Sequence, residues 1–339
     1  MRGGEALAVG ELDYGYLNGR LRAAEVKLLD RASLFRLAEA GSFEEMMSLM
    51  GETPYGRWFP ELGSDSEGVL HREWLWTLDE FGSISPNRAL TDLFRAELDF
   101  HNLRVLLKGR LAGGEGVNRS DLLRRMLPGG TVSPEALLYA VESGSLRDLP
   151  PAMASSLEGH LEWSVDSVPH MEAFLDGAMF EYMSSLAFAS GEPFAVGYVR
   201  LRADLENLRT AFRLKVAGAD VGSLSQRLVR VGALPTHLFT GVFPEQVPAW
   251  PKAFFHTPLS ALVEEICGLG GDLGALELAL DRHMLSFLSR ARFSAFGGGP
   301  LVAYLHWKRI EIYNLRAIMV GKRNGVSPEE IRRRLRYLE

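Results

Sequence analysis

The residues of this sequence that are best suited to chemistry form a short motif of an acid, an asparagine and an arginine. It reads Asp99-x-x-Asn102-Leu103-Arg104. On a helix the acid lies one turn before the asparagine, so a carboxylate, an amide and a guanidinium are held near one another. Such a set can brace a helix against its neighbours through hydrogen bonds and ion pairs, or it can bind a polar ligand. We expect the structural role and keep ligand binding as the alternative.

This motif occurs three times in the chain. Each copy continues with a basic residue eight positions after the asparagine and a glycine eleven positions after it. The three sets are Asp99, Asn102, Arg104, Arg110 and Gly113; Asp204, Asn207, Arg209, Lys215 and Gly218; and Glu311, Asn314, Arg316, Lys322 and Gly325. Successive asparagines are 105 and 107 residues apart. Five matching positions at a nearly constant interval indicate an internal repeat.

A second pattern supports the repeat. The sequence Glu-x-x-Leu-Asp-x-x-Met begins at Glu172 and again at Glu277, 105 residues later. The first copy keeps only a trace of it, which we place at Leu78-Asp79. We therefore divide the chain into three helical modules of similar length. The predicted modules are residues 1–115, 116–220 and 221–339.

The elements that must position these motifs are predicted to be helices. Apolar residues recur at intervals of three and four nearly everywhere, which is the helical period. Runs of alternating β-branched residues are missing, so the sequence predicts an all-α fold. Serine or threonine before an acid or a proline is typical of a helix start. Such starts are expected at Ser42, Ser133, Ser155, Thr257 and Ser327.

The motif asparagine itself carries a structural prediction. An asparagine inside a helix competes with the backbone for hydrogen bonds and lowers helix propensity. Because all three copies keep it, we expect each one to bond a neighbouring helix or loop. We also expect the three modules to superpose with these side chains equivalent. The basic residue and the glycine that follow are typical of the C-terminal end of a helix.

The composition excludes several classes of protein. The chain has 339 residues with 37 Lys and Arg against 43 Asp and Glu, a net charge of -6 that does not favour a nucleic-acid partner. The single cysteine, Cys267, excludes an internal disulfide and a cysteine zinc site. There is no signal-peptide core and no run of about 20 apolar residues, so we expect no direct membrane insertion.

Sequence signatures of catalysis are also missing. Gly321-Lys322-Arg323 lacks the upstream glycine and the hydroxyl residue of a phosphate-binding loop. The glycine-rich stretch 268–274 does not follow a strand, as a dinucleotide loop would. None of the eight histidines lies three or four residues from another, the spacing of a helical metal site. We predict no catalytic residue, no cofactor, no metal site and no enzymatic activity.

Three such modules, together with the ends of the chain, resemble a known family. The opening Tyr16-Leu17-Asn18-Gly19-Arg20 and the closing Gly321-Lys322-x-Asn324-Gly325 carry the resemblance, which extends from Gly10 to Leu335. The chain is similar to the C subunits of the archaeal and bacterial A/V-type rotary ATPases, relatives of the d subunit of the vacuolar enzyme. The stretch from Thr53 to Ile84 departs from the family pattern, and no contact is carried over to it.

The resemblance implies both a fold and a role. The fold would be a funnel of three similar helical domains around a pseudo-threefold axis. Its wide end would sit on the membrane rotor ring of proteolipid subunits, at the cytoplasmic face, and its socket would receive the central shaft of subunits D and F. The protein would be non-catalytic and peripheral to the membrane through the ring. The alternative is a soluble helical-repeat adaptor protein that is unrelated to rotary ATPases.

The sequence contains no phosphate-binding loop of the kind that holds nucleotides. The purified chain should neither bind nor hydrolyse ATP, because no segment offers the row of backbone amides and the lysine that cradle phosphates. Titration calorimetry checks this directly. A micromolar dissociation constant for ATP would contradict it.

Overall fold

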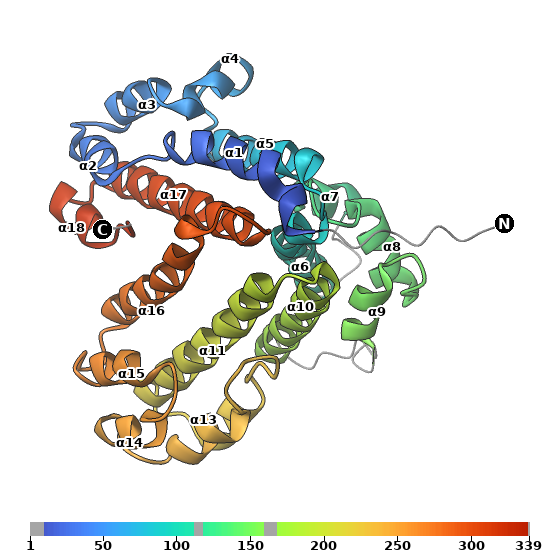
Figure 1. The fold of residues 1–339 in the computed structure, drawn as a ribbon, viewed down its shortest axis with the longest axis vertical. Coiled ribbons are helices and arrows are strands. Elements are labelled where there is room, and N and C mark those ends of the chain that lie inside the picture. The colour runs from blue at the N-terminus through green and yellow to red at the C-terminus, as the bar shows by residue number, and fades with distance from the viewer. Residues whose placement is uncertain (1–9, 112–117, 159–167, 338–339) are drawn as a thin grey trace. The chain divides into compact units, whose positions relative to one another are not determined.

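The computed structural model describes residues 10–111, 118–158 and 168–337 (Figure 1). Every regular element in these residues is a helix, which confirms the all-α prediction. The chain divides into two compact units, one formed by Met1–Thr91 with Leu285–Glu339 and the other by Asp92–Met284. These units cut the chain at other places than the three predicted modules, whose boundaries stay a prediction.

The first unit joins segments from both ends of the chain. Its central helix, α17, is buried on every side from Gly299 to Lys308 and contacts α1, α2, α3 and α5. Its helices are η1 (Glu11–Tyr14), α1 (Gly15–Glu25), α2 (Arg31–Glu39), α3 (Phe43–Gly51), η2 (Pro54–Trp58), α4 (Phe59–Leu62), α5 (Ser66–Ile84), η4 (Arg290–Phe293), α17 (Gly299–Arg323) and α18 (Pro328–Arg333). The two chain ends therefore share one core.

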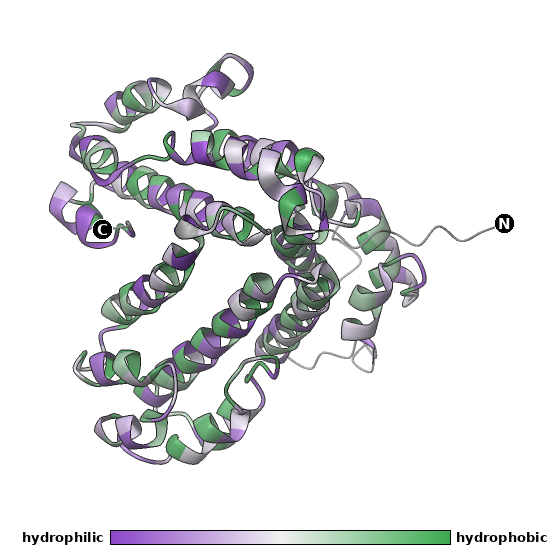
Figure 2. Ribbon diagram, in the orientation of Figure 1, coloured by the Kyte–Doolittle hydropathy of each residue, from purple (hydrophilic) through white to green (hydrophobic). Residues whose placement is uncertain are grey.

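The second unit is built around two long helices, α10 and α11, which pack side by side. Gly191, with a φ of 67°, makes the short turn between them. Helix α10 is hydrophobic along most of its length (Figure 2). The helices of this unit are α7 (Arg119–Arg125), α8 (Pro134–Ser143), α9 (Pro151–Leu157), α10 (Val168–Ser190), α11 (Pro193–Val216), α12 (Val221–Ser225), α13 (Thr236–Val242), η3 (Val247–Ala249), α14 (Trp250–Phe254) and α15 (Ser260–Cys267).

Two further long helices cross the limits of the units. Helix α6 (Ala89–Leu111) begins in the first unit and continues into the second, and α16 (Leu273–Ser289) runs in the opposite sense from the second into the first. Each of the three motif asparagines lies on a long helix, namely α6, α11 or α17. The long helices therefore carry the repeated side chains.

Three of the five predicted helix starts are confirmed. The hydroxyls of Ser42, Ser133 and Ser327 each accept a hydrogen bond from the backbone N–H three residues later. Each satisfies one of the donors that a helix N-terminus leaves free. These three caps begin α3, α8 and α18.

The predictions at Ser155 and Thr257 are wrong. Ser155 lies inside α9, because Pro151 occupies the first turn and starts that helix earlier. Thr257 accepts a hydrogen bond from the N–H of Leu259, but α15 begins only at Ser260. A proline fixes the start of α9 more strongly than a serine and an acid at the right spacing.

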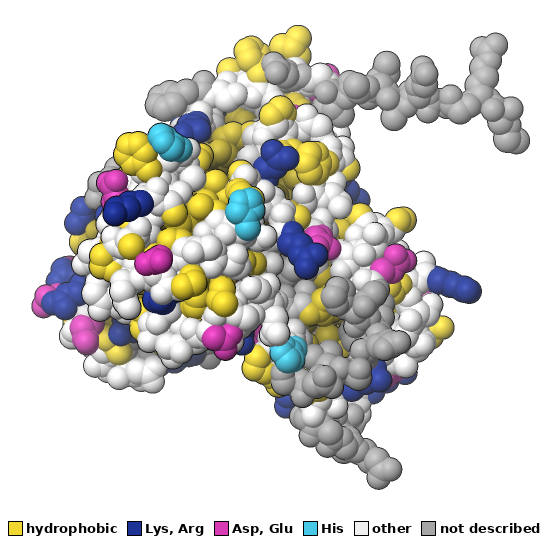
Figure 3. All heavy atoms as spheres, turned by 90° about the horizontal axis from the view of Figure 1, so that it is seen from below, with side chains coloured by type: hydrophobic (Ala, Val, Ile, Leu, Met, Phe, Trp, Pro, Cys, Tyr) yellow, Lys and Arg dark blue, Asp and Glu magenta, His cyan; other side chains and the backbone are white. Residues whose placement is uncertain are grey.

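The described residues contain no helix that combines the length and the apolar character needed to cross a membrane. On the face drawn in Figure 3, the lysine and arginine side chains of the described residues are scattered among acidic and hydrophobic ones. They do not gather into one patch on that face.

Candidate functional site

The repeated asparagines are fully buried, and each is bonded to a single loop residue. Asn102 donates from Nδ2 to the carbonyl oxygen of Leu127 at 2.8 Å, and its Oδ1 accepts from the N–H of Leu127 at 2.7 Å. Asn207 makes the same two bonds with Val229, at 2.8 and 2.7 Å. Each side-chain amide therefore donates one hydrogen bond to, and accepts one from, the backbone of a single residue.

The third asparagine repeats this geometry in the first unit. Asn314 accepts from the N–H of Arg336 at 2.8 Å and donates to the carbonyl oxygen of the same residue. The bonded residue comes 25, 22 and 22 positions after the asparagine in the three copies. The bonded residue lies just after the short helix that follows the motif helix, which is α7, α12 or α18. Each bond pair fixes that segment onto the motif helix, and pairs the buried amide with the backbone.

The motif acids of the first two copies hold the same loops a few residues further on. Asp99 accepts from the N–H of Thr131 at 2.9 Å, from its hydroxyl at 2.6 Å and from the N–H of Val132 at 3.1 Å. Asp204 accepts from the N–H groups of Ala233 and Leu234, at 3.1 and 3.0 Å. Two consecutive N–H groups therefore point at one carboxylate in both copies.

A glycine allows each of these carboxylates to approach the backbone. A Cβ placed on Gly130 would lie 2.0 Å from Oδ1 of Asp99, and one on Gly232 would lie 2.1 Å from Oδ1 of Asp204. Neither glycine belongs to the motif found in the sequence. Each stands three residues after the residue that the asparagine bonds, Leu127 or Val229, a spacing that appears only in the structure.

Burial changes the acidity of these two carboxyl groups. It raises the pKa of Asp99 to about 6, although the hydrogen bonds from Thr131 act in the opposite direction. It also raises the pKa of Asp204 to about 6, against the two N–H groups that favour its ionised form. Both groups can therefore change charge near neutral pH.

The acid of the third copy has different partners. Glu311 accepts from the N–H of Leu29 at 2.5 Å, from the hydroxyl of Tyr55 at 2.6 Å and from Nζ of Lys308 at 2.6 Å. Leu29 and Tyr55 come from the N-terminal segment, and Lys308 lies on α17 with Glu311. A buried cation and two groups from the other end of the chain take the place of the glycine loop.

Lys308 connects this acid to a second one. Its Nζ lies 3.0 Å from Oε1 of Glu73, on α5, and both side chains are buried. Glu73 also accepts from Arg57 at 2.6 Å and from the indole of Trp58 at 2.7 Å. Two carboxylates are thus matched by two cations, which a buried cluster requires.

Each motif arginine joins its helix to another long helix, and in the first two copies the paired acid comes 68 residues further on. Arg104 pairs with Glu172 at 3.0 Å and also with Asp176, and Arg209 pairs with Glu277 at 3.0 Å. In the first unit, Arg316 pairs with Glu67 at 3.0 Å. These contacts join α6 to α10, α11 to α16, and α17 to α5.

The acids in these pairs show that the first copy of the second pattern lies elsewhere than predicted. Glu67, Glu172 and Glu277 are 105 residues apart, so the first copy of the second pattern begins at Glu67 and not near Leu78-Asp79. This copy keeps the glutamate and the leucine of the pattern, but His71 and Trp74 stand where the later copies have aspartate and methionine.

The basic residues of the motif cap short helices in all three copies. Arg110 donates to the carbonyl oxygen of Val141 at 3.3 Å, Lys215 to that of Phe243 at 2.8 Å and Lys322 to that of Ala40 at 2.5 Å. These carbonyls lie at the C-terminal ends of α8, α13 and α2. A cation is favourable there, because the last carbonyls of a helix have no partner within it.

The last motif position is a glycine. Gly218 and Gly325 follow the ends of α11 and α17 with φ of 70° and 65°, the left-handed conformation of a helix C-cap. Gly113 lies outside the described residues.

Within the described residues, no group of three or more His, Cys, Asp or Glu side chains could hold a metal ion. The motif's polar groups bond to protein, which favours bracing over ligand binding.

Comparison with known proteins identifies the family. The sequence profile of the ATP synthase (C/AC39) subunit matches residues 17–334. The chain belongs to this family. The C subunit of the V-type sodium ATPase of Enterococcus hirae is 23% identical over 96% of the chain and 99% of that protein. The match disfavours an adaptor protein that is unrelated to rotary ATPases.

Two further relatives carry related names. The C subunit of the A-type ATP synthase of Methanocaldococcus jannaschii is 25% identical over 94% of this chain and 85% of its own length. The C subunit of the V-type ATP synthase of Thermus thermophilus is 27% identical over 90% of this chain and 93% of its own length. The similarity therefore extends over nearly the whole of each protein.

Replacing a motif asparagine by leucine should be destabilising. Asn102→Leu, Asn207→Leu and Asn314→Leu should each lower the free energy of unfolding by about 1–3 kcal/mol, because a buried backbone N–H and carbonyl lose their partner. Urea unfolding measures the change. The exposed Asn324, replaced by leucine, serves as the control and should have a much smaller effect. Unchanged stability in all three motif variants would contradict the bracing role.

A methyl group at the close-approach glycines should also be destabilising. Gly130→Ala and Gly232→Ala should each cost on the order of 1–3 kcal/mol, because the added carbon would overlap a carboxylate oxygen. Gly177→Ala is the matched control, since Gly177 lies within α10 with open space around a Cβ. That control should be neutral or stabilising by about 0.5–1 kcal/mol. Equal effects at the three glycines would argue against the carboxylate contact.

The raised pKa of Asp204 predicts a pH dependence of stability. The folded pKa of about 6 lies above the unfolded value of about 3.9, so the folded state holds the proton more tightly. The resulting stabilisation is fully present below about pH 4 and is lost as the pH rises through about 6. Compared with Asp204→Asn, the wild-type chain should therefore gain stability as the pH falls from about 7 to about 5. Unfolding curves at several pH values would refute this if the difference stayed constant.

Proposed function

We propose that this chain is a non-catalytic component of the central stalk of a V/A-type rotary ATPase. In this role it is the socket that couples the shaft of subunits D and F to the membrane rotor ring, and so links ATP turnover to the transport of protons or sodium ions. Membership of the ATP synthase (C/AC39) subunit family supports the assignment. The names of its relatives, which are C subunits of A- and V-type enzymes, agree with it.

The ion pairs of the three motif arginines follow a cyclic order, which supports a threefold arrangement of the modules. Helices α6, α11 and α17 each reach the long helix that precedes the next motif helix, and α17 reaches α5 near the N-terminus. The series therefore returns to its start. A funnel of three similar domains around a pseudo-threefold axis requires such a cyclic order of contacts. The modules would be 1–115, 116–220 and 221–339, with the last completed by N-terminal residues.

A stiff body is what torque transmission demands, and the motif supplies stiffness. Each copy fixes a loop by the asparagine, a short helix by the basic residue and a long helix by the arginine. Buried and fully satisfied polar networks make a structure rigid. The polar side chains of the motif are engaged in these bonds, which suits a mechanical role better than a catalytic one.

The proposal predicts a bridging activity that can be measured by co-sedimentation. The chain should pellet with liposomes that carry the rotor ring and should not pellet with plain anionic liposomes, because its net charge of -6 does not favour anionic headgroups. Subunits D and F should pellet with the ring liposomes only when the chain is added. Liposomes carrying an unrelated membrane protein are the control.

Two results would overturn the proposed role. Equal pelleting with and without the ring would remove the ring as a partner. Retention of D and F by the ring liposomes to the same extent without the chain would show that it does not couple the shaft to the ring.

A further inference from the structure

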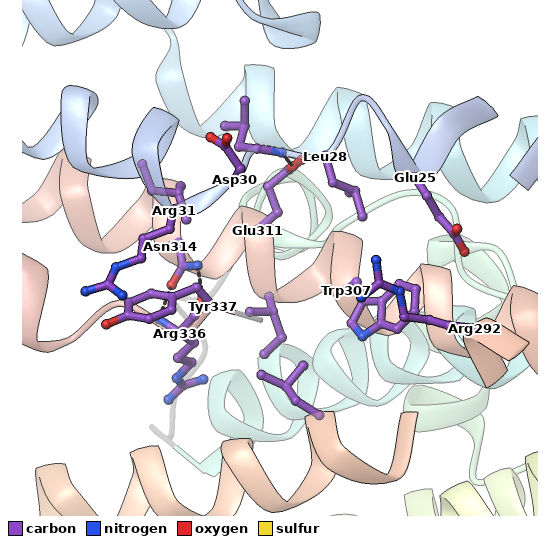
Figure 4. A pocket seen from close by; sticks show the side chains of 14 residues that line it. Glu25, Leu28, Asp30, Arg31, Arg292, Trp307, Glu311, Asn314, Arg336 and Tyr337 are labelled. Carbon is purple, nitrogen blue, oxygen red and sulfur yellow. Dashed lines mark hydrogen bonds between the residues drawn. The ribbon is translucent and has the colours of Figure 1, made fainter. Parts of the chain in front are cut away.

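A cavity of about 350 Å³ lies within the first unit, between the loop that joins α1 to α2, helix α17 and the segment that follows α18 (Figure 4). Acidic, basic and apolar side chains all line it. Trp307 and Arg292 lie together at one end, and Arg31 and Tyr337 lie at the other (Figure 4). The hydrogen-bonding groups of this lining show what kind of ligand it can accept.

The acidic side chains of the cavity are already engaged. Glu25 accepts two hydrogen bonds from Arg22, at 2.9 and 2.8 Å. Asp30 caps α2 by accepting from the N–H of Ser33 at 2.8 Å. Glu311 holds the three donors described above. The carboxylates of the lining therefore have partners that neutralise or satisfy them within the protein.

Two donors of the cavity have no acceptor in the part of the chain that the structure describes. Trp307 is only 5% exposed, and its indole N–H is buried without a hydrogen-bond partner. The exposed guanidinium of Arg292 lies over the same indole, 5.8 Å from the ring centre, and forms no ion pair with a described carboxylate. A buried N–H without a partner costs on the order of 1–3 kcal/mol.

The remaining wall near these donors is apolar. Leu28, Leu285 and Ile310 contribute aliphatic surface to the cavity. A ligand that complements this lining needs an anionic acceptor at the end with Trp307 and Arg292 and an apolar body along these side chains. Arg292 is exposed, so its guanidinium can change rotamer to meet a ligand beside the indole.

We propose that this cavity binds a carboxylate carried on a short apolar body. The carboxylate accepts from the indole N–H of Trp307 and pairs with the guanidinium of Arg292, a charge-assisted contact that is stronger than one between neutral groups. The body lies against Leu28, Leu285 and Ile310. A free organic acid and an acidic side chain of a partner protein share this chemistry. The inference rests on this lining alone and does not depend on the proposed function.

Titration calorimetry of the full chain with 3-phenylpropionate tests the proposal. A ligand of this size should bind with a dissociation constant on the order of millimolar. The neutral analogue 3-phenylpropanamide should bind about tenfold more weakly, because it lacks the charge. Trp307→Phe removes the indole N–H together with part of the bicyclic ring. Affinity for the acid should fall about fivefold to tenfold, and affinity for the neutral amide should fall less, because only the acid uses the N–H as a partner for its charge. Arg292→Gln should lower it by a similar factor or more.

Two matched variants control for indirect effects. Trp250→Phe and Arg282→Gln change a buried tryptophan and an exposed arginine that do not belong to the lining of the cavity. Neither should change the affinity for 3-phenylpropionate.

A second arm separates the two sources of the carboxylate. The blocked peptide acetyl-Phe-Glu-amide presents the same group as a protein side chain. Binding of the peptide alone, with the same loss in Trp307→Phe, would assign the cavity to a partner's acidic residue, and binding of the free acid would assign it to an organic acid. The proposal is overturned if neither binds up to about 10 mM. It is also overturned if acid and amide bind equally, or if Trp307→Phe and Arg292→Gln have no effect.

Discussion

A side-chain amide buried inside a helix must find both a donor and an acceptor, and this requirement organises each copy of the repeat. The motif asparagine meets it by bonding the N–H and the carbonyl of one backbone residue in the loop after the next short helix. Once that loop is fixed, the other motif side chains have defined partners. The acid lies three residues earlier and the arginine two residues later on the same helix, so their directions are set by the same bond pair.

The third copy shows which of these interactions recur in all three copies and which one is exchanged. Its asparagine and its arginine keep the contacts of the other copies, and its basic residue still caps a short helix. Its acid does not bind a glycine loop. Glu311 is held instead by Lys308 and by groups of the N-terminal segment, and Lys308 also pairs with Glu73, whose charge is balanced by Arg57. The exchange ties both ends of the chain into one unit.

The sequence could predict those parts of the brace that depend on identical residues at constant spacing. The repeat, the helices and the caps of α11 and α17 belong to this class, since asparagine and glycine are chemically hard to replace there. It could not predict the glycines opposite the acids, because the loops between Asn102 and Gly130 and between Asn207 and Gly232 differ in length. The first copy of the second pattern was also misplaced, because His71 and Trp74 replace the aspartate and the methionine of the later copies.

Other features depend on contacts between distant parts of the chain. The cavity with Trp307 combines residues that are more than 270 positions apart, so no local sequence pattern predicts it. The division into two units also reflects packing between the ends of the chain, which periodicity and capping signals do not encode. Family membership, by contrast, follows from the order and spacing of motifs along the whole chain.

Amide hydrogen exchange at the three bonded loop residues measures the central claim most directly. The N–H groups of Leu127, Val229 and Arg336 each donate to a motif asparagine, so all three should exchange slowly and be released only by large-scale opening. In Asn207→Leu, the N–H of Val229 should exchange much faster while that of Leu127 stays protected. Exchange of all three in the wild-type chain at the rate of exposed loop amides would contradict the account.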